Sequence, residues 1–343
     1  MDILKQILVR SYLNTGKATD LETIQLPIFK FFGHKYWNRK DVHMIIPKNK
    51  HREQVAINTR VLEGMPKAVC EETYMDKITP LFESIEDNGI FTTTGTEHSR
   101  YNLYTLTGRP SNTNKGVNYA ALNKDDKSRE RFISRHEDGV LVEFDYDAYH
   151  LRLIAGLIDY EFSEASVHTH LGKMYFDTNN LTNEEYEESK RISFRVLYGG
   201  IPKEFENIEY FKKTKAYIFE LWDSYNERGY IETPIFGRRF YKKNYEDMSP
   251  QKLFNYLIQA YETEKNIEVM EKIQALLKDR KTKLVLYTYD SFLFDVAPED
   301  GKSLLFELKA LMGLPTKSKY GKNYDAMKPL ACLLYTSPSP RDS

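Results

Sequence analysis

The sequence predicts an α+β fold built on an antiparallel sheet. Residues 139–145 form a short apolar run after a glycine, as in a buried strand, and pass into helical spacing over 148–158. Residues 283–296 hold two β-rich runs around Asp290-Ser291, which is typical of a hairpin. We expect the remaining apolar patterns to be helices at 183–198, 211–228, 250–279 and 298–312.

Local signals mark the ends of these expected helices. The pattern at 183–198 begins with Asn183 and two glutamates and stops at a pair of glycines. The pattern at 211–228 ends at Gly229, and the one at 250–279 opens with Ser249-Pro250. An earlier helical pattern that starts near Lys67 ends at Gly89.

Composition sets the limits of the interpretation. The 343 residues, 41% of them hydrophobic, suffice for one large or two ordinary cores. The formal net charge of −1 does not indicate a nucleic-acid binder, although an acidic metal site can offset basic grooves. There is no run of eighteen apolar residues, and the two cysteines form no metal-type cluster. We therefore expect a cytoplasmic protein without a membrane span.

The end of the chain differs in character from the rest. Residues 331–343 are rich in Ser and Pro and show no periodicity, so we expect a non-native tail there and leave it out of the fold.

Two aspartates lie where a metal site could form. Asp145 is at the end of the first predicted strand, and Asp290 is at the tip of the predicted hairpin. Each alone fits an ordinary helix cap or turn residue. If the hairpin lies beside the first strand, the two carboxylates could hold two Mg²⁺ ions about 3.5–4 Å apart.

The helical pattern at 183–198 carries a second candidate site. Lys190, Phe194 and Tyr198 follow each other at intervals of four and share one face. A cation and two rings suit a nucleotide, although the same stripe fits a helix with its aromatic side in the core. Upstream, the polar stretch 104–118 contains Arg109 and suits backbone contact with phosphates, or is a plain surface loop.

Seven short segments occur in order over about residues 100–325. They are TGR at 107–109, NYAAL at 118–122, DYDAYHLR at 145–152, KRISFRVLYG at 190–199, GYIET at 229–233 with FGRR at 236–239, FN at 254–255 with Gln259, and YDS at 289–291. In this order they resemble the motifs of DNA polymerase family A, the family of bacterial DNA polymerase I.

The resemblance implies a right-hand polymerase, with an antiparallel-sheet palm, helical fingers and a partial helical thumb. It places the partial thumb or N-terminal region in 1–90, the palm in 91–165 and 240–330, and the fingers in 166–239. The implied activity is that of a DNA-directed DNA polymerase with two Mg²⁺ ions, primer–template DNA and deoxynucleoside triphosphates as its cofactors and partners. The divergence of the motifs favours a phage-type member, acting in the host cytoplasm.

The resemblance also implies residue roles. The two ions would be held by Asp145, Asp290 and the carbonyl of Tyr146. The incoming nucleotide would meet Lys190, His168, Phe194, Tyr198 and His150. The DNA near the primer end would meet Arg109, Asn118, Asn255, Gln259 and Tyr289.

The motifs near the carboxylates depart from the family pattern. His150 stands where a glutamate usually excludes ribonucleotides, and we expect the bulky imidazole to keep this role. Tyr289 and Ser291 flank Asp290 in place of His and Glu. Asp147 replaces a serine and could supply the missing carboxylate.

The helix motif departs as well. Tyr186 stands one turn before Lys190 where the family has an arginine, and Arg191 or Arg195 could supply that charge.

Two other interpretations stay open. A single-subunit RNA polymerase shares the palm and has an Asp-Ser pair in the corresponding hairpin, as here. A non-catalytic DNA-binding module derived from a polymerase would also keep the motifs in this order. The sequence has no second acidic cluster for a 3′→5′ exonuclease, so we expect that activity, or a missing N-terminal segment, to be supplied elsewhere.

Overall fold

A computed structural model describes residues 42–48, 53–58 and 74–331, except 104, 106, 113–118, 120–121, 123–125 and 246. Most of the predicted partial thumb, Asn118 and all but the first residue of the predicted tail lie outside the described residues. The described chain forms two compact units. We call residues 147–264 the helical unit, and the described residues before and after them the sheet unit. No helix in the described part of the chain is both long and apolar enough to cross a membrane.

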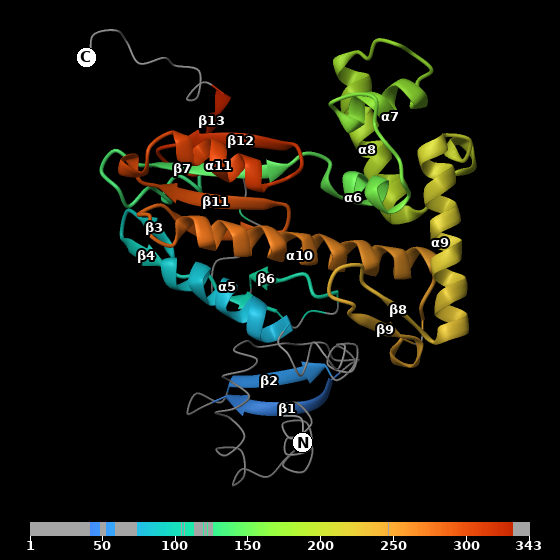
Figure 1. Cartoon of the computed structure of the whole chain (residues 1–343), viewed down its shortest axis with the longest axis horizontal. Helices are drawn as coiled ribbons and strands as arrows, with labels where there is room; N and C mark the ends of the chain where they lie inside the picture. Colours follow the sequence, from blue (N-terminus) through green and yellow to red (C-terminus); the bar gives the residue numbers. More distant parts are fainter. Residues whose placement is uncertain are drawn as a thin grey trace. The chain divides into compact units, whose positions relative to one another are not determined.

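A five-stranded antiparallel sheet is the centre of the sheet unit, as Figure 1 shows. The expected strand and hairpin are present and are direct neighbours, with β11 paired to β7. In sheet order, the strands are β10 (Lys283–Thr288), β11 (Ser291–Val296), β7 (Val140–Tyr146), β12 (Thr316–Gly321) and β13 (Lys328–Pro329). The predicted α+β fold with an antiparallel sheet is therefore confirmed.

No sequence pattern predicted β12, although this strand pairs with β7 along its whole length. Its residues, TKSKYG, contain no apolar run, and only the last of them is buried. A strand with such a polar face lacks the signal by which buried strands are found. β12 brings Lys317 opposite Asp145 and Lys319 opposite Glu143.

One helix packs beside the hairpin. α5 (Tyr74–Asn88) contacts β10, and the Asn88 side-chain amide donates to the Leu284 carbonyl at 2.9 Å. Gly89 ends α5 with φ of +58°, where a Cβ atom would lie 2.6 Å from the methyl group of Thr96. Only glycine fits this combination of a left-handed backbone and a crowded neighbour.

Short elements complete the sheet unit. Three pairs of strands each form a separate two-stranded antiparallel sheet. They are β1 (Val42–Lys48) with β2 (Glu53–Asn58), β3 (Ile90–Thr92) with β4 (Gly95–Glu97), and β5 (Tyr101–Asn102) with β6 (Ser111–Asn112).

The helix expected at 298–312 is divided. A 3₁₀ turn at Pro298–Asp300 ends at Gly301, whose φ of +75° breaks the helical path, and α11 runs over Ser303–Leu311. The Tyr146 hydroxyl donates to the carbonyl of Met312 at 3.0 Å, just beyond the end of α11. The contact ties the end of β7 to this helix.

The helical unit holds the elements between the two parts of the sheet unit. They are α6 (Tyr149–Leu157), α7 (Val167–Tyr175), α8 (Asn183–Gly199), α9 (Glu209–Arg228), the hairpin of β8 (Tyr230–Glu232) and β9 (Arg239–Tyr241), 3₁₀ turns at Lys203–Phe205 and Lys242–Asn244, and the start of α10 (Pro250–Leu277). α7 packs against α8 (Figure 1). The expected helices at 183–198, 211–228 and 250–279 are confirmed to within two residues.

The N-terminus of α8 differs in one detail from the expectation. Thr182, not Asn183, is the cap, because its hydroxyl accepts from the Glu185 backbone N–H at 3.2 Å. The Glu185 carboxylate in turn accepts from the Thr182 N–H at 2.8 Å. This reciprocal pair satisfies two backbone donors and fixes where the helix begins.

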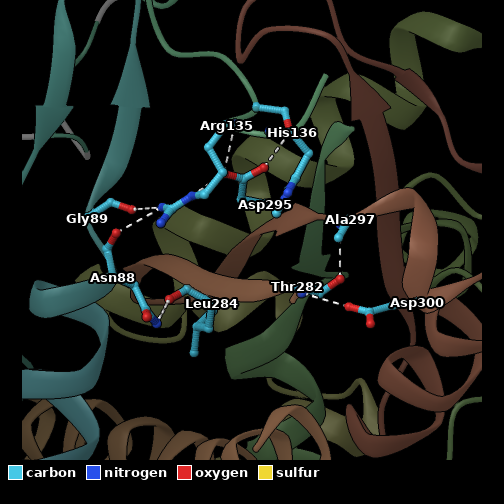
Figure 2. Close-up of polar contacts among 10 residues, drawn as sticks. Asn88, Gly89, Arg135, His136, Thr282, Leu284, Asp295, Ala297 and Asp300 are labelled. Atoms are coloured by element: carbon cyan, nitrogen blue, oxygen red, sulfur yellow. Dashed lines mark hydrogen bonds and ion pairs between the residues drawn. The ribbon is translucent and has the colours of Figure 1, made fainter. Parts of the chain in front are cut away.

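A buried polar network fastens β11 to the chain around it (Figure 2). Asp295, with 1% of its side chain exposed, accepts from the Ser134 hydroxyl at 2.5 Å and from Arg135 Nε at 2.7 Å. The Arg135 guanidinium also donates to the carbonyls of Asn88 and Gly89, at 2.8 and 2.7 Å. The network therefore joins the end of α5 to the sheet.

Replacing Asp295 with Asn is expected to destabilise the protein by about 1–3 kcal/mol, because the partly exposed Arg135 guanidinium loses its buried ionic partner and the hydrogen bonds from Ser134 and Arg135 are no longer charge-assisted. Urea unfolding measures the change. Glu299→Gln is the control, since its ion pair with Lys281 is on the surface and its loss should leave the unfolding midpoint nearly unchanged. Equal midpoints for wild type and Asp295→Asn would contradict this prediction.

Candidate active site

The two predicted metal aspartates meet at one end of the central strands. Asp145 on β7 is opposite Ser291, the first residue of β11, and Asp290 directly precedes that residue. The Tyr146 N–H donates to the Asp290 carbonyl at 2.9 Å, so the hydrogen-bond ladder continues into the turn. The juxtaposition on which the sequence interpretation depended is present.

The environment of Asp145 disfavours its negative charge. Burial raises the pKa of Asp145 from an ordinary value of 3.8 to about 7, with further contributions from the charges of Asp290 and Glu143. The two lysines of β12 oppose this rise. The lysines do not fully neutralise the negative charge that Asp145 shares with Asp290 and Glu143, so a cation bound there would be stabilised.

Glu143 shares the sheet face of Asp145, two residues earlier on β7. Its carboxylate accepts a hydrogen bond from the Tyr324 hydroxyl at 2.9 Å, and burial raises the pKa of that tyrosine far above its ordinary value. Sequence reasoning did not single out Glu143, because a strand glutamate carries no motif. Its charge makes the site more acidic than the two predicted aspartates alone.

The turn that carries Asp290 is held from two sides. Tyr289 has a left-handed backbone with φ of +56°, and its carbonyl accepts from the Asn266 amide at 2.7 Å. The Arg109 guanidinium lies over the Tyr289 ring, 3.9 Å from its centroid. Arg109 and Tyr289, predicted to act together on DNA, are therefore in direct contact, and Asn266 is a supporting residue that the sequence did not reveal.

Ser291 is uncharged and therefore adds no carboxylate to the acidic cluster. Its hydroxyl bonds to the Thr288 hydroxyl across the turn at 2.6 Å, and only 7% of the residue is exposed. Where the family pattern has a glutamate, this chain has a bond that closes the hairpin.

Asp147, which could have supplied the missing carboxylate, has a cation beside it. Its Oδ2 atom is 3.4 Å from the Arg152 guanidinium, and Arg152 also donates to the Asp147 carbonyl at 2.8 Å. No group of three or more His, Cys, Asp or Glu side chains suited to a metal ion occurs among the described residues. Asp147 is therefore paired with a cation of its own chain, and the acidic residues of the candidate site are Asp145, Asp290 and Glu143.

The nucleotide-facing stripe predicted for α8 is on the surface of the helical unit. Phe194 is 57% exposed and Tyr198 41% exposed, and their rings stack at 6.4 Å with an angle of 10°. The alternative, an aromatic stripe in the core, is excluded for these two residues. Exposed aromatic side chains in parallel orientation are suited to contact a base or a sugar.

Lys190 and His168 share a neighbour. The Lys190 ammonium is 4.3 Å from the centre of the Tyr186 ring and 2.6 Å from the Glu187 carboxylate. The His168 ring is nearly perpendicular to the same Tyr186 ring, with centroids 6.4 Å apart. Tyr186, at the position of the expected arginine, therefore contacts both groups that were predicted to meet a triphosphate.

The arginines considered as replacements differ from that arrangement. Arg191 pairs with Glu188 on the surface, and Arg195 is exposed. Neither observation supports the expectation that one of them supplies the charge missing at Tyr186.

His150 is a central contact of the helical unit rather than an isolated bulky residue. Its Nδ1 atom is 2.8 Å from the Tyr198 hydroxyl, and its Nε2 atom is 3.3 Å from a carboxylate oxygen of Glu262. Glu262 is 1% exposed. No motif indicated Glu262, which lies in an otherwise ordinary helical pattern 112 positions further along the chain.

The predicted DNA contacts on α10 have different surroundings. The Asn255 amide donates to the Tyr198 carbonyl at 3.4 Å, and Gln251 donates to the Leu197 carbonyl at 2.7 Å. Gln259 is half-buried, and its carbonyl accepts from Thr263 at 3.2 Å. Asn255 therefore supports the end of α8 in this structure, and Gln251 is a supporting residue that the motif did not indicate.

These observations define a sheet with paired carboxylates and a helical unit with an exposed cationic and aromatic stripe. Residues 44–322 match DNA polymerase family A, and the chain belongs to this family.

Relatives of known identity agree with the family. The chain is 24% identical over 292 residues to DNA polymerase I of Synechocystis sp., covering 71% of this chain and 29% of that protein. It is 25% identical over 295 residues to the thermostable DNA polymerase I of Thermus aquaticus, covering 76% of this chain and 34% of that one. The chain thus spans about a third of the length of these relatives.

A solved structure supports the fold. The polymerase domain of Pol1 from M. smegmatis, in complex with DNA primer–template and dNTP, superposes with a TM-score of 0.58 and 16% identity. The match covers 94% of this chain and 66% of that one. The similarity confirms the right-hand polymerase fold class predicted from the sequence.

Without divalent ions, Asp145→Asn is expected to stabilise the protein at about pH 8 by about 1–3 kcal/mol. Because the pKa of Asp145 is raised in the folded state, its protonated carboxyl makes its full contribution to stability at pH values below the unfolded-state pKa of about 4. That contribution is lost as the pH rises through about 7. The advantage of the variant should therefore shrink between about pH 7 and pH 4.

Urea unfolding in the presence of a chelator measures this dependence. Asp138→Asn is the matched control, because the Asp138 side chain is 90% exposed and its replacement should give no such pH trend. A stability difference that stays constant over the whole pH range would contradict the electrostatic account of Asp145.

Proposed function

We propose that this chain is the polymerase part of a DNA-directed DNA polymerase, which adds deoxynucleotides to the 3′ end of a primer on a DNA template. The pairing of β7 with β11, which brings Asp145 beside the Asp290 turn, is the observation that carries the proposal. Membership of DNA polymerase family A gives the reaction class. The M. smegmatis neighbour, described with primer–template DNA and dNTP, suggests the same partners here.

Two divalent ions fit the donor set at the sheet. Mg²⁺ prefers hard oxygen ligands and takes a few carboxylates together with substrate phosphates. Asp145, Asp290 and the Tyr146 carbonyl supply oxygen ligands at one strand end. Burial, and then the charges of Asp290 and Glu143, raise the pKa of Asp145, and a bound cation would offset that effect. Such ions, when bound, favour the ionised primer hydroxyl and stabilise the leaving pyrophosphate.

The helical unit supplies the nucleotide contacts in this proposal. Lys190 and His168, which both contact Tyr186, would bind the triphosphate. Phe194 would pack against the base and sugar, and Tyr198 would lie at the templating position. The support is the exposure of both rings, since an aromatic side chain in the core could not make these contacts.

The primer end of the DNA would meet a separate set of residues. The minor groove presents acceptors common to correct base pairs, so donors there can test pairing without reading sequence. We propose Arg109, Tyr289, Asn255, Gln259 and Asn118 for this role. The Arg109–Tyr289 contact supports it, because stacking holds the guanidinium in a fixed orientation.

The phage-type origin and a role in viral replication stay predictions from the divergence of the motifs. The named relatives are bacterial proteins.

Primer extension tests the proposal directly. Asp145→Ala and Asp290→Ala are each expected to lower the rate of dNTP addition about 10²–10³-fold, because each removes charge that stabilises the transition state. Asp138→Ala is the control, since its exposed side chain is outside the carboxylate pair. Mg²⁺ should also raise the melting temperature of wild type and not that of Asp145→Ala or Asp290→Ala.

The outcomes separate the alternatives. Extension with ribonucleotides in preference to deoxynucleotides would favour the single-subunit RNA polymerase reading. Tight primer–template binding without Mg²⁺-dependent extension by wild type would favour the non-catalytic module and overturn the proposal.

His150→Ala is expected to raise ribonucleotide incorporation relative to deoxynucleotide incorporation by about tenfold, because it removes bulk and a Tyr198 contact beside the proposed sugar site. Single-nucleotide insertion with matched dNTP and rNTP measures the ratio. The exposed His98, replaced with Ala, is the control. An unchanged ratio in His150→Ala would show that the imidazole does not exclude the 2′-hydroxyl.

A further inference from the structure

We propose that Glu262 is a positioning residue for sugar discrimination, acting through His150 on the hydroxyl of Tyr198. The inference rests on the proposed polymerase function. It goes beyond that function because Glu262 belongs to none of the motifs and contacts no substrate in the proposal.

The three side chains form a chain of contacts from the interior to the surface. Glu262 is 1% exposed and His150 9% exposed, whereas Tyr198 is 41% exposed. Glu262 Oε2 is 3.3 Å from His150 Nε2, and His150 Nδ1 is 2.8 Å from the Tyr198 hydroxyl. The imidazole thus connects a buried carboxylate to an aromatic residue on the nucleotide-facing stripe.

The carboxylate determines which ring nitrogen carries the proton. A carboxylate near Nε2 favours the tautomer with hydrogen on that atom, and the lone pair of Nδ1 is then the acceptor. The Tyr198 hydroxyl must then donate to Nδ1, which fixes the direction of its O–H bond. Without the carboxylate, both tautomers of His150 become available, and the Tyr198 hydroxyl loses its defined role as donor.

The backbone of the same segment is held from the same helix. Gln251 donates to the Leu197 carbonyl and Asn255 to the Tyr198 carbonyl, at 2.7 and 3.4 Å. Gln251, Asn255 and Glu262 are spaced i, i+4 and i+11, so they follow one side of α10. This side of α10 therefore contacts the end of α8 through its main chain and, by way of His150, through the Tyr198 hydroxyl.

A fixed hydroxyl also fixes a ring. The Tyr198 ring stacks on Phe194, which is 57% exposed, so the orientation of one exposed ring limits the other. In the proposed function these rings and His150 border the sugar of the incoming nucleotide. A change at buried Glu262 is therefore expected to appear as altered selection between deoxyribose and ribose.

The test compares insertion of dNTP and rNTP by full-length wild type, Glu262→Gln, Tyr198→Phe and the double variant. Each single change should lower the discrimination ratio, kcat/KM for dNTP over that for rNTP, by about three- to tenfold, as expected when one hydrogen bond is lost. The double variant should be no worse than either single one, because both changes break the same chain of contacts. Additive losses, or a wild-type ratio in Tyr198→Phe, would overturn the proposal.

Glu264→Gln is the matched control. Glu264 is also 1% exposed and lies two residues further along α10, but it bonds to the Thr233 hydroxyl and to the Ile235 N–H instead of a histidine. It should lose stability and keep the wild-type discrimination ratio. If it lowers the ratio as much as Glu262→Gln, the effect is a general result of removing a buried acid, and the proposal fails.

A second readout is independent of catalysis. Nitrogen-15 spectra of histidine-labelled protein, with His150 assigned by loss of its signals in His150→Gln, report which ring nitrogen is protonated. Wild type should show hydrogen on Nε2, and Tyr198→Phe should shift the Nδ1 signal. Hydrogen on Nδ1 in wild type would refute the proposed chain of contacts from Glu262 to Tyr198. If the spectra are as expected but the protein extends no primer, only the polymerase function is refuted. If Glu262→Gln does not fold, Tyr198→Phe decides both readouts.

Discussion

The pairing of β7 with β11 is the constraint on which the rest of the sheet unit depends. β7 ends at Tyr146 and β11 begins at Ser291, so more than a hundred residues separate the two strands in sequence, and their pairing closes a long loop. Asp145 and Asp290 gain a common environment through that closure and not through proximity in sequence. Repulsion between them is tolerated because the apolar strands around them gain much more from burial.

Polar side chains around the strands limit how the acidic end can move. Asp295 and Arg135 tie β11 to the end of α5, and Asn266 and Arg109 hold the residue before Asp290. The bonds of Ser291 and of Tyr146 close the same turn from within the sheet. The acidic pair is thus held by contacts from several separate segments, as a preorganised site requires.

Sequence patterns predicted the elements that bury apolar surface. β7, the hairpin of β10 and β11, and helices α8, α9 and α10 all had apolar periodicity and end signals. β12 was missed because its face is polar, and α7 because its two histidines, its threonine, its glycine and its lysine interrupt the apolar spacing.

The candidate site was predictable only in part. The motif order placed Asp145, Asp290 and the α8 stripe, but it could not show that Phe194 and Tyr198 are exposed instead of buried. Glu262, Asn266 and Gln251 contact predicted site residues only because distant segments fold together, and a single side-chain contact leaves no periodic trace in a sequence. Roles that depend on one side chain meeting another therefore had to come from the structure.

The lysines of β12 give the acidic strand end a property that the motifs alone do not suggest. With Lys317 opposite Asp145 and Lys319 opposite Glu143, charges of opposite sign alternate across two neighbouring strands. In the proposed function, a metal ion at these carboxylates would therefore compete with two lysine ammonium groups that belong to the chain itself. Under that proposal, we expect the metal to bind weakly and to exchange readily.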